Sequence, residues 1–152
     1  MDRQRTNLDH SVAARRPPQI IPSSRHRIRV IFDHRTIADT TRALRVSEAR
    51  SPRTWYVPAE DVRLDLLEPS SGTIWCEFKG LARFYDIVVP GRISTSAAWA
   101  YPQPRVGYGV LRNHFCFMAS RVDEAWVDDR RAHEGPDGLA GGWITREVVD
   151  LS

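Results

Sequence analysis

The sequence is poor in the residues that build stapled, metal-bound or membrane-spanning proteins. It has two cysteines, Cys76 and Cys116, and they form no Cys-x-x-Cys pair. Two distant cysteines exclude a disulfide framework and supply no tetrahedral zinc site. No run approaches the roughly 18 apolar residues of a membrane helix, and the N-terminus lacks the apolar segment of a secretory signal. We therefore expect a cytoplasmic protein without metal, cofactor or membrane contact.

Lysine is almost absent too, although basic residues are plentiful. The chain has 22 basic residues, and all of them are arginine except Lys79. Arginine keeps its charge in any environment, whereas lysine is a compact ammonium group that can lose its proton when it is desolvated. A lone lysine in so arginine-rich a chain marks a position where arginine would not serve. Lys79 is therefore the first candidate functional residue.

The remaining composition predicts one globular domain behind a basic arm. Apolar residues make up 41% and charged residues 27% of the 152 residues, an ordinary balance for a folded domain of that size. The net charge of +3 comes largely from arginines near the N-terminus. We expect residues 1–26 to form a flexible, solvated arm, in which Ile20 and Ile21 allow a short strand, and residues 27–152 to form the domain. Nucleic-acid contact by the arm is the less favoured alternative.

Alternation of apolar and polar residues predicts strands along most of the domain. In the segment ALRVSEA, alternation places Leu44, Val46 and, more weakly, Glu48 on one face. Arg45 and Ser47 then lie on the opposite face. The other predicted strands are 27–33, 36–40, 54–58, 72–80, 81–89, 93–101, 114–119, 124–129 and 143–151.

Turn residues predict how these strands connect. The stretches 33–35 and 90–92 are tight turns that predict hairpins, and strands 114–119 and 124–129 are expected to pair with each other. Segment 131–142 is rich in glycine and predicts a mobile loop. One short helix is expected in PAEDVRLDLLEPS, which begins at Pro58 and has acids in its first turn. Many short strands and one short helix indicate a mainly β domain, either a barrel or a folded-over sheet.

Three short blocks resemble a known family. They are Tyr-x-Pro-x-Glu-Asp-Val at 56–62, Cys-x-Phe-Lys-Gly at 76–80 and Ala-Trp-x-Tyr-Pro at 98–102. In this order, within residues 27–130, they resemble the domain of unknown function 427 family of small bacterial and fungal proteins. The resemblance implies a single compact domain of two antiparallel sheets that meet at an angle, the β-tent or Mss4-like arrangement. It implies no established activity.

The chain departs from this resemblance at two positions. Members of the family usually carry proline after the cysteine of the second block and often histidine before it, whereas this chain has Glu77 and Trp75 there. A role for that histidine is therefore not expected. Relatives of the fold bind zinc through cysteine pairs, and this chain lacks the pairs. The nucleotidyltransferase label in some names of the family has no Gly-rich phosphate loop or paired carboxylates to support it here.

The candidate site is a pocket around Lys79. Tyr56, Trp99 and Tyr101 stand at strand ends beside prolines, where aromatic side chains wall a cleft in folds of this kind. We expect them to form the sides of a polar, aromatic-walled pocket with Lys79 and Asp61 at its base. In a purely structural alternative, Lys79 simply pairs with a carboxylate such as Asp61 or Glu77.

Cys76 needs a special geometry to join this site. It lies three residues before Lys79, and on a regular strand such residues face opposite sides. Only a turn or a bulge between them would bring the thiol and the ammonium together. Buried cysteines are common and usually inert, so Cys76 is a distant candidate for chemistry.

Two functions follow from these residues. The first is a small-molecule binding module without chemistry of its own. The second is an enzyme acting on a small polar metabolite, with Lys79 or Asp61 transferring a proton. A strongly perturbed lysine pKa would favour the enzyme and an ordinary one the binding module. The identity of the ligand and the oligomeric state are not readable from the sequence.

Overall fold

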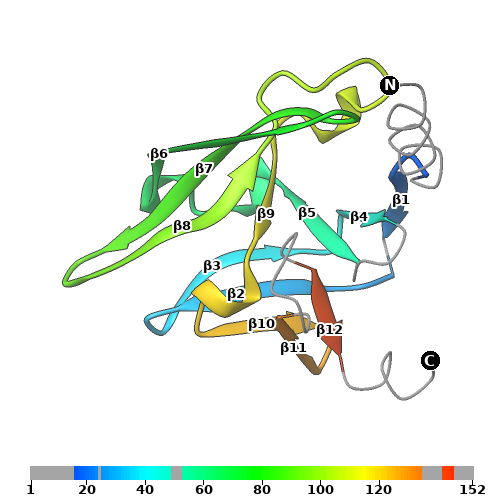
Figure 1. Ribbon diagram of the computed structural model, residues 1–152. Helices are drawn as coiled ribbons and strands as arrows, with labels where there is room; N and C mark the ends of the chain where they lie inside the picture. Colours follow the sequence, from blue (N-terminus) through cyan, green and yellow to red (C-terminus); the bar gives the residue numbers. More distant parts are fainter. Residues whose placement is uncertain (1–15, 24, 49–52, 135–141, 146–152) are drawn as a thin grey trace, which may run out of the picture.

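The chain folds into two antiparallel sheets, and the computed structural model describes residues 16–23, 25–48, 53–134 and 142–145. Figure 1 shows the larger sheet above the smaller one, with strands that run in different directions. The expected mainly β domain of two angled antiparallel sheets is confirmed. In order across it, the seven-stranded sheet contains β1 (Gln19–Ser23), β4 (Ala43–Ser47), β5 (Thr54–Pro58), β9 (His114–Phe117), β8 (Arg92–Ala100), β7 (Gly80–Val89) and β6 (Leu67–Cys76). The five-stranded sheet contains β12 (Trp143–Thr145), β11 (Arg130–Glu134), β10 (Glu124–Val127), β2 (Ile28–Phe32) and β3 (Arg35–Thr40).

Both hairpins predicted from tight turns are confirmed. In the β2–β3 hairpin, Asp33 and His34 form the turn and have positive φ angles of 53° and 62°. Aspartate accepts this conformation more readily than most residues, and such turns match the twist of the flanking strands. In the β7–β8 hairpin the turn is Pro90–Gly91, where Gly91 has a φ of 79°. A side chain would strain the backbone at that angle.

The segment expected to form one short helix contains two separate 3-10 turns, η1 (Ala59–Asp61) and η2 (Leu64–Leu66). Between them Val62 is extended and bridges β3. The Arg63 backbone N–H donates to the Ile37 carbonyl oxygen at 2.8 Å. These contacts satisfy backbone groups that a continuous helix would have used, so pairing with β3 overrides the helical pattern. Among the described residues, no helix is long and apolar enough to cross a membrane.

The link between β9 and β10 crosses from one sheet to the other. The prediction that 114–119 and 124–129 pair with each other is therefore wrong. β9 pairs with β5 and β8, while β10 pairs with β2 and β11. Cys116 and Phe117 are both fully buried, and adjacent strand residues face opposite sides. β9 thus needs a central place in the larger sheet, which a hairpin with β10 alone would not provide.

Two segments that overlap the predicted flexible arm and mobile loop contain strands. β1 falls inside the predicted arm 1–26 and pairs with β4 along its whole length. β11 overlaps the predicted loop 131–142 and pairs with β10 and β12. The rest of each prediction, residues 1–15 and 135–141, lies outside the described residues. Ile20 partly explains β1, because its side chain packs against the buried residues of the larger sheet.

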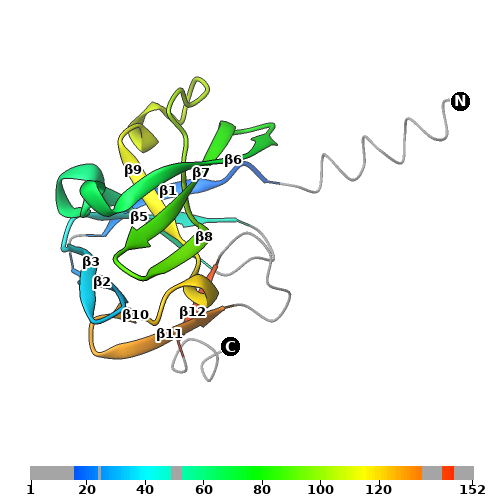
Figure 2. The same ribbon diagram turned by 90° about the vertical axis from the view of Figure 1, so that its left-hand side faces the viewer.

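The centre of the seven-stranded sheet, around β5, the end of β8 and β9, is buried on both faces, which gives the protein two cores. Trp55 and Val57 of β5 belong to core 1 between the sheets, and Tyr56 belongs to core 2 on the other face. Segment 101–113, which includes η3 (Gly109–Leu111), covers core 2. Figures 1 and 2 place this segment at the end of the molecule away from the five-stranded sheet. The buried residues of core 2 are Leu44, Val46, Tyr56, Ala82, Trp99, Tyr101, Leu111 and Cys116.

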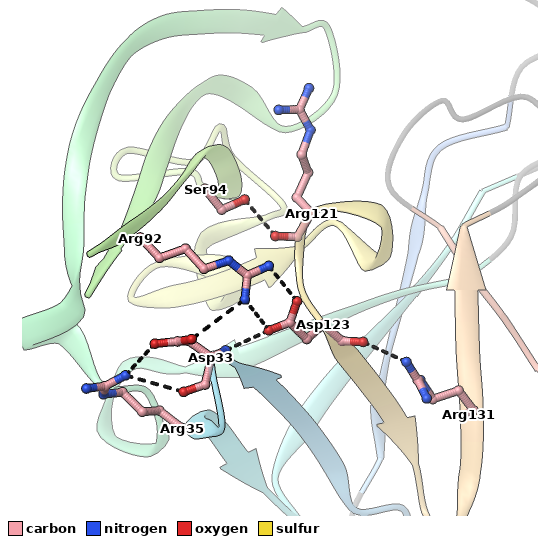
Figure 3. A network of polar contacts seen from close by, with 7 residues as sticks. All are labelled: Asp33, Arg35, Arg92, Ser94, Arg121, Asp123 and Arg131. Atoms are coloured by element: carbon pink, nitrogen blue, oxygen red, sulfur yellow. Dashed lines mark hydrogen bonds and ion pairs between the residues drawn. The ribbon is translucent and has the colours of Figure 1, made fainter. Parts of the chain in front are cut away.

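A polar network ties the β7–β8 hairpin to the smaller sheet (Figure 3). Arg92 donates to the two carboxylate oxygens of Asp123 at 2.6 and 2.7 Å. Its guanidinium also lies over the ring of Phe32, 4.2 Å from the ring centre. The Asp33 backbone N–H donates to Asp123 at 2.7 Å. One arginine of the larger sheet thereby binds two turns of the smaller one.

Candidate functional site

A tight turn places Lys79 at the edge of core 2. β6 ends at Cys76 and β7 begins at Gly80, and these two residues pair across the turn. The Lys79 backbone N–H points at the Cys76 sulfur, 3.4 Å away. Gly80 has a φ of 109°, and a Cβ atom there would lie 3.3 Å from the Gln103 carbonyl oxygen. The turn that Cys76 and Lys79 needed in order to meet is therefore present.

The ammonium of Lys79 is buried and paired with Glu48. Lys79 is only 5% exposed, and its Nζ donates to Glu48 Oε2 at 2.9 Å. The Nζ atom also lies 5.4 Å from the centre of the Tyr101 ring. Burial lowers the pKa of Lys79, but attraction to Tyr101 and Glu48 outweighs burial and raises that pKa above its ordinary value. Lys79 is accordingly a permanent cation at neutral pH.

Asp61 lies elsewhere and has other partners. Its Oδ2 accepts a hydrogen bond from the Thr40 hydroxyl at 2.6 Å and forms an ion pair with Arg42 at 3.1 Å. The expected pairing of Lys79 with Asp61 is therefore wrong. The physical reason is the η1 turn, whose short extent aims the carboxylate at the end of β3. Glu48 takes the place that sequence reasoning gave to Asp61.

Tyr56, Trp99 and Tyr101 come together as expected, but as a packed core. All three are buried, and Trp99 Nε1 donates to the Tyr56 hydroxyl at 3.1 Å. The Tyr56 ring lies edge-on to Trp99 with centres 6.3 Å apart, and 6.4 Å from Tyr101. Burial raises the pKa of Tyr56 well above its ordinary value. These rings fill core 2, and none of them lines the hollow described below.

Cys116 lies beneath the same rings and is chemically protected. It is fully buried, and this burial raises the pKa of its thiol strongly. The thiolate that nucleophilic chemistry requires is therefore scarce at neutral pH. Across the parts of the chain that the structure describes, no three His, Cys, Asp or Glu side chains gather as a metal site requires.

An open hollow of about 600 Å³ lies beside the Lys79 turn. Arg105 is held at this hollow by its backbone N–H, which donates to the Lys79 carbonyl oxygen at 3.0 Å. Its guanidinium donates to the Glu77 carbonyl oxygen and lies over the Trp75 ring, 5.8 Å from the ring centre. The lining residues are Pro17, Glu77, Phe78, Pro104, Arg105, Val106 and Tyr108.

Tyr108 borders both the hollow and core 2. Its hydroxyl donates to the Pro18 carbonyl oxygen at 2.8 Å and so attaches segment 101–113 to the chain just before β1. Burial raises the pKa of Tyr108, and the positive charge of Lys79 opposes that rise. The electrostatic influence of Lys79 thus extends to a wall of the hollow.

Sequence reasoning missed three residues of this site. Glu48 carried a usable signal, because alternation placed it on the face of Leu44 and Val46, and both belong to core 2. Arg105 and Tyr108 carried none. They lie in a loop without periodicity, where only the fold decides which side chains turn inward.

The three sequence blocks at 56–62, 76–80 and 98–102 meet in this part of the molecule. They supply Tyr56, Cys76, Trp99 and Tyr101 to core 2, and they place Lys79 against it. Residues 20–128 match a family described as a domain of unknown function, DUF427. The chain belongs to the domain of unknown function 427 family.

The residues of the three blocks build core 2 and the Lys79 turn. They lie in one region of the fold, although the blocks come from β5, the β6–β7 turn and β8. No curated protein matches the sequence of this chain. The family match carries no described activity, so the function is argued from the site.

Proposed function

We propose that this member of the domain of unknown function 427 family is a binding domain for a small molecule with a flat ring and an anionic group. The ligand would enter the hollow beside the Lys79 turn. One observation carries this proposal: Phe78, Tyr108 and Arg105 line the same open hollow of about 600 Å³. Two aromatic side chains and a guanidinium are thus available to one ligand. Ligand sites commonly measure about 300–1,000 Å³ and combine apolar walls with a few polar groups.

Arg105 would bind the anionic group of the ligand. A guanidinium has five N–H donors, and the contact with the Glu77 carbonyl occupies one of its terminal nitrogens. Stacking on Trp75 orients the guanidinium plane, so little side-chain entropy would be lost on binding. A carboxylate or phosphate can accept two parallel hydrogen bonds from such a group.

The apolar walls would take the ring of the ligand. Val106 is fully exposed in the free protein and lines the hollow with Phe78 and Tyr108. A ring laid against these side chains would remove apolar surface from water, at about 25 cal/mol per Å² buried. A ligand that has only the ring or only the anion would use half of this arrangement.

Lys79, Tyr56, Trp99 and Tyr101 would support the site without touching the ligand. The Lys79–Glu48 pair holds the turn, and the backbone of that turn holds Arg105. The buried rings form the packed layer beneath. Asp61 has no part in this proposal, because its partners are Thr40 and Arg42.

Proton transfer by Lys79 finds no support in its electrostatics. A general base at neutral pH needs a lowered lysine pKa, and the surroundings of Lys79 raise that pKa instead. The distance of Asp61 from Lys79 affects both hypotheses alike, because each of them used Asp61. The raised lysine pKa is therefore the observation that favours the binding module over the enzyme.

A thermal-shift screen tests the proposal. The library would contain three matched groups: aromatic anions, neutral aromatics and non-aromatic anions. We expect aromatic anions to raise the melting temperature most, since a ligand at 100 times its Kd adds about 2.7 kcal/mol to stability. Arg105→Gln should abolish the rise in melting temperature that these aromatic anions cause. Arg112→Gln, which removes an exposed arginine from the same covering segment, should preserve it.

The proposal fails if no aromatic anion stabilises the wild-type protein at millimolar concentration. It also fails if the hits stabilise Arg105→Gln as strongly as Arg112→Gln. Trp75 gives a second readout, because Arg105 stacks on its exposed ring. Ligand binding to Arg105 should change the fluorescence of Trp75, and Trp75→Phe should remove that change.

A further inference from the structure

The face of β4 opposite core 2 carries a second concentration of positive charge. Arg45 is in the middle of β4, paired with Ile21 of β1 and Trp55 of β5. Alternation turns it away from core 2, to which its neighbours Leu44 and Val46 belong.

Arg53 lies beside Arg45 on this face. It immediately precedes β5, two residues before Trp55, so it stands diagonally across from Arg45. Its backbone is fixed, because its carbonyl oxygen accepts from the Trp143 N–H at 2.9 Å. The pairing of Val46 with Thr54 also brings Ser47 next to Arg53.

The two guanidiniums have no counter-ion among the residues that the structure describes. Arg45 Nε is buried and has no hydrogen-bond partner. Burial and repulsion from Arg53 lower the pKa of Arg45, and no carboxylate contributes to that shift. Other arginines of the chain differ: Arg27, for example, is bound to Asp39 through two hydrogen bonds.

An unpaired buried donor beside a like charge is unfavourable unless something satisfies it. An anion bound at the terminal nitrogens of both guanidiniums would offset the repulsion between the two arginines. Because two single positive charges stand side by side, a dianion fits better than a monoanion. Ser47, on the same face as Arg45, adds a hydroxyl donor.

We propose that Arg45 and Arg53 form a binding site for a phosphate group. Phosphate oxygens match the forked donors of guanidinium, and the three oxygens of a phosphomonoester would meet Arg45, Arg53 and Ser47. The site is on the face of the sheet opposite core 2 and is independent of the hollow beside Lys79. Its ligand is either inorganic phosphate or the phosphate group of a small monoester.

Nitrogen-15 NMR of the arginine Nε–H groups tests this site directly. The Arg45 signal is assigned by its loss in Arg45→Lys, which keeps the charge but lacks the Nε–H. Inorganic phosphate is titrated at constant ionic strength against chloride, and methyl phosphate is titrated in a second arm. We expect a saturable shift of the Arg45 signal, with affinity at least about tenfold weaker in Arg53→Gln and unchanged in Arg112→Gln.

The two arms separate the sources of the phosphate group. Equal or tighter binding of methyl phosphate assigns the site to monoesters, and binding of inorganic phosphate alone assigns it to the free ion. An Arg45 signal that moves no more with either phosphate than with chloride overturns the proposal, as does equal affinity in Arg53→Gln and Arg112→Gln.

Melting curves give a second measurement if Arg45→Lys does not fold. Phosphate should stabilise the wild-type protein and Arg112→Gln over chloride at equal ionic strength, and it should not stabilise Arg53→Gln. The same phosphate stabilisation in all three proteins overturns the site.

Discussion

The Lys79–Glu48 pair should be the most sensitive ion pair of the fold, and its two partners should differ in how much they matter. The Lys79 side chain is 6% exposed and that of Glu48 is 26% exposed. Replacing either partner leaves the other charge in place. Because the ammonium lies deeper, an unpaired ammonium should cost more stability than an unpaired carboxylate.

The expected losses follow from this asymmetry. Breaking a buried ion pair from one side typically costs about 3–5 kcal/mol of stability. Lys79→Met leaves a carboxylate that water can reach, so we expect a loss of about 2 kcal/mol, below that range. Glu48→Gln leaves a buried ammonium, so we expect about 3 kcal/mol. The double variant buries no unpaired charge and should lose about 2 kcal/mol, far less than the sum of the single losses.

Urea unfolding, followed by tryptophan fluorescence, measures these values. With an m-value of about 2 kcal/mol/M, a loss of 3 kcal/mol lowers the midpoint by about 1.5 M. Asp65→Asn is the matched control, because it breaks the exposed ion pair with Arg63, which has a similar N–O distance of 2.8 Å. We expect no measurable change there. A larger loss in Lys79→Met than in Glu48→Gln, or additive losses in the double variant, would refute the reasoning.

The raised pKa of Lys79 gives the same pair a pH signature. A lysine whose pKa is raised by folding stabilises the protein fully below its unfolded pKa, and the contribution is lost as pH rises through its folded pKa. The stability difference between the wild-type protein and Lys79→Met should therefore be constant at neutral pH and shrink above about pH 10. A difference that grows with alkaline pH would contradict the raised pKa.

Two further predictions concern the turns that hold the sheets. Arg92→Gln should make stability depend less on pH in acid. The hydrogen bond from Arg92 lowers the pKa of Asp123, so the stability that this bond contributes is present above about pH 4 and is lost as pH falls through the folded pKa. Acid melting curves identical to those of the wild-type protein would show that the network of Figure 3 adds no stability. Gly80→Ala should lower the free energy of unfolding in urea by about 2 kcal/mol, because φ is 109° and the new Cβ would lie 3.3 Å from the Gln103 carbonyl oxygen. Gly72→Ala is the control, because its Cβ meets only the edge of a ring at 3.5 Å and should change stability little. Equal losses in the two variants would contradict the assignment of the cost to backbone strain at Gly80.

Strands could be predicted from the sequence because burial leaves a period-two pattern. The hairpin turns at 33–35 and 90–92 were also predicted, since such turns need residues that tolerate special backbone angles. The pairing of β9 with β10 was predicted wrongly, because sequence neighbours are the natural first choice for a hairpin. Nothing local indicates that β9 leaves for another sheet. The same limit applies to β1, whose partner β4 lies beyond two strands of the smaller sheet.

The candidate site was half accessible to sequence reasoning. Lys79 stood out through its chemistry, and Tyr56, Trp99 and Tyr101 do converge beside it. Whether rings line a pocket or fill a core depends on what covers them, and segment 101–113 covers these. Asp61 was expected at the base of the pocket, but Val62 pairs with β3 and the Asp61 carboxylate binds Thr40 and Arg42 instead.

The single lysine is best explained by the shape of its site. Position 79 enters core 2 from a tight turn, where one carboxylate at 2.9 Å and one aromatic face are available to a cation. An ammonium on a slender stem needs few acceptors, whereas a guanidinium is wider and has five N–H donors to satisfy. Arg45 illustrates the difference on the other face of β4, where its buried Nε has no partner. Lysine therefore stands at position 79 because a compact cation can be buried there with one partner, and its scarcity elsewhere is no evidence of proton transfer.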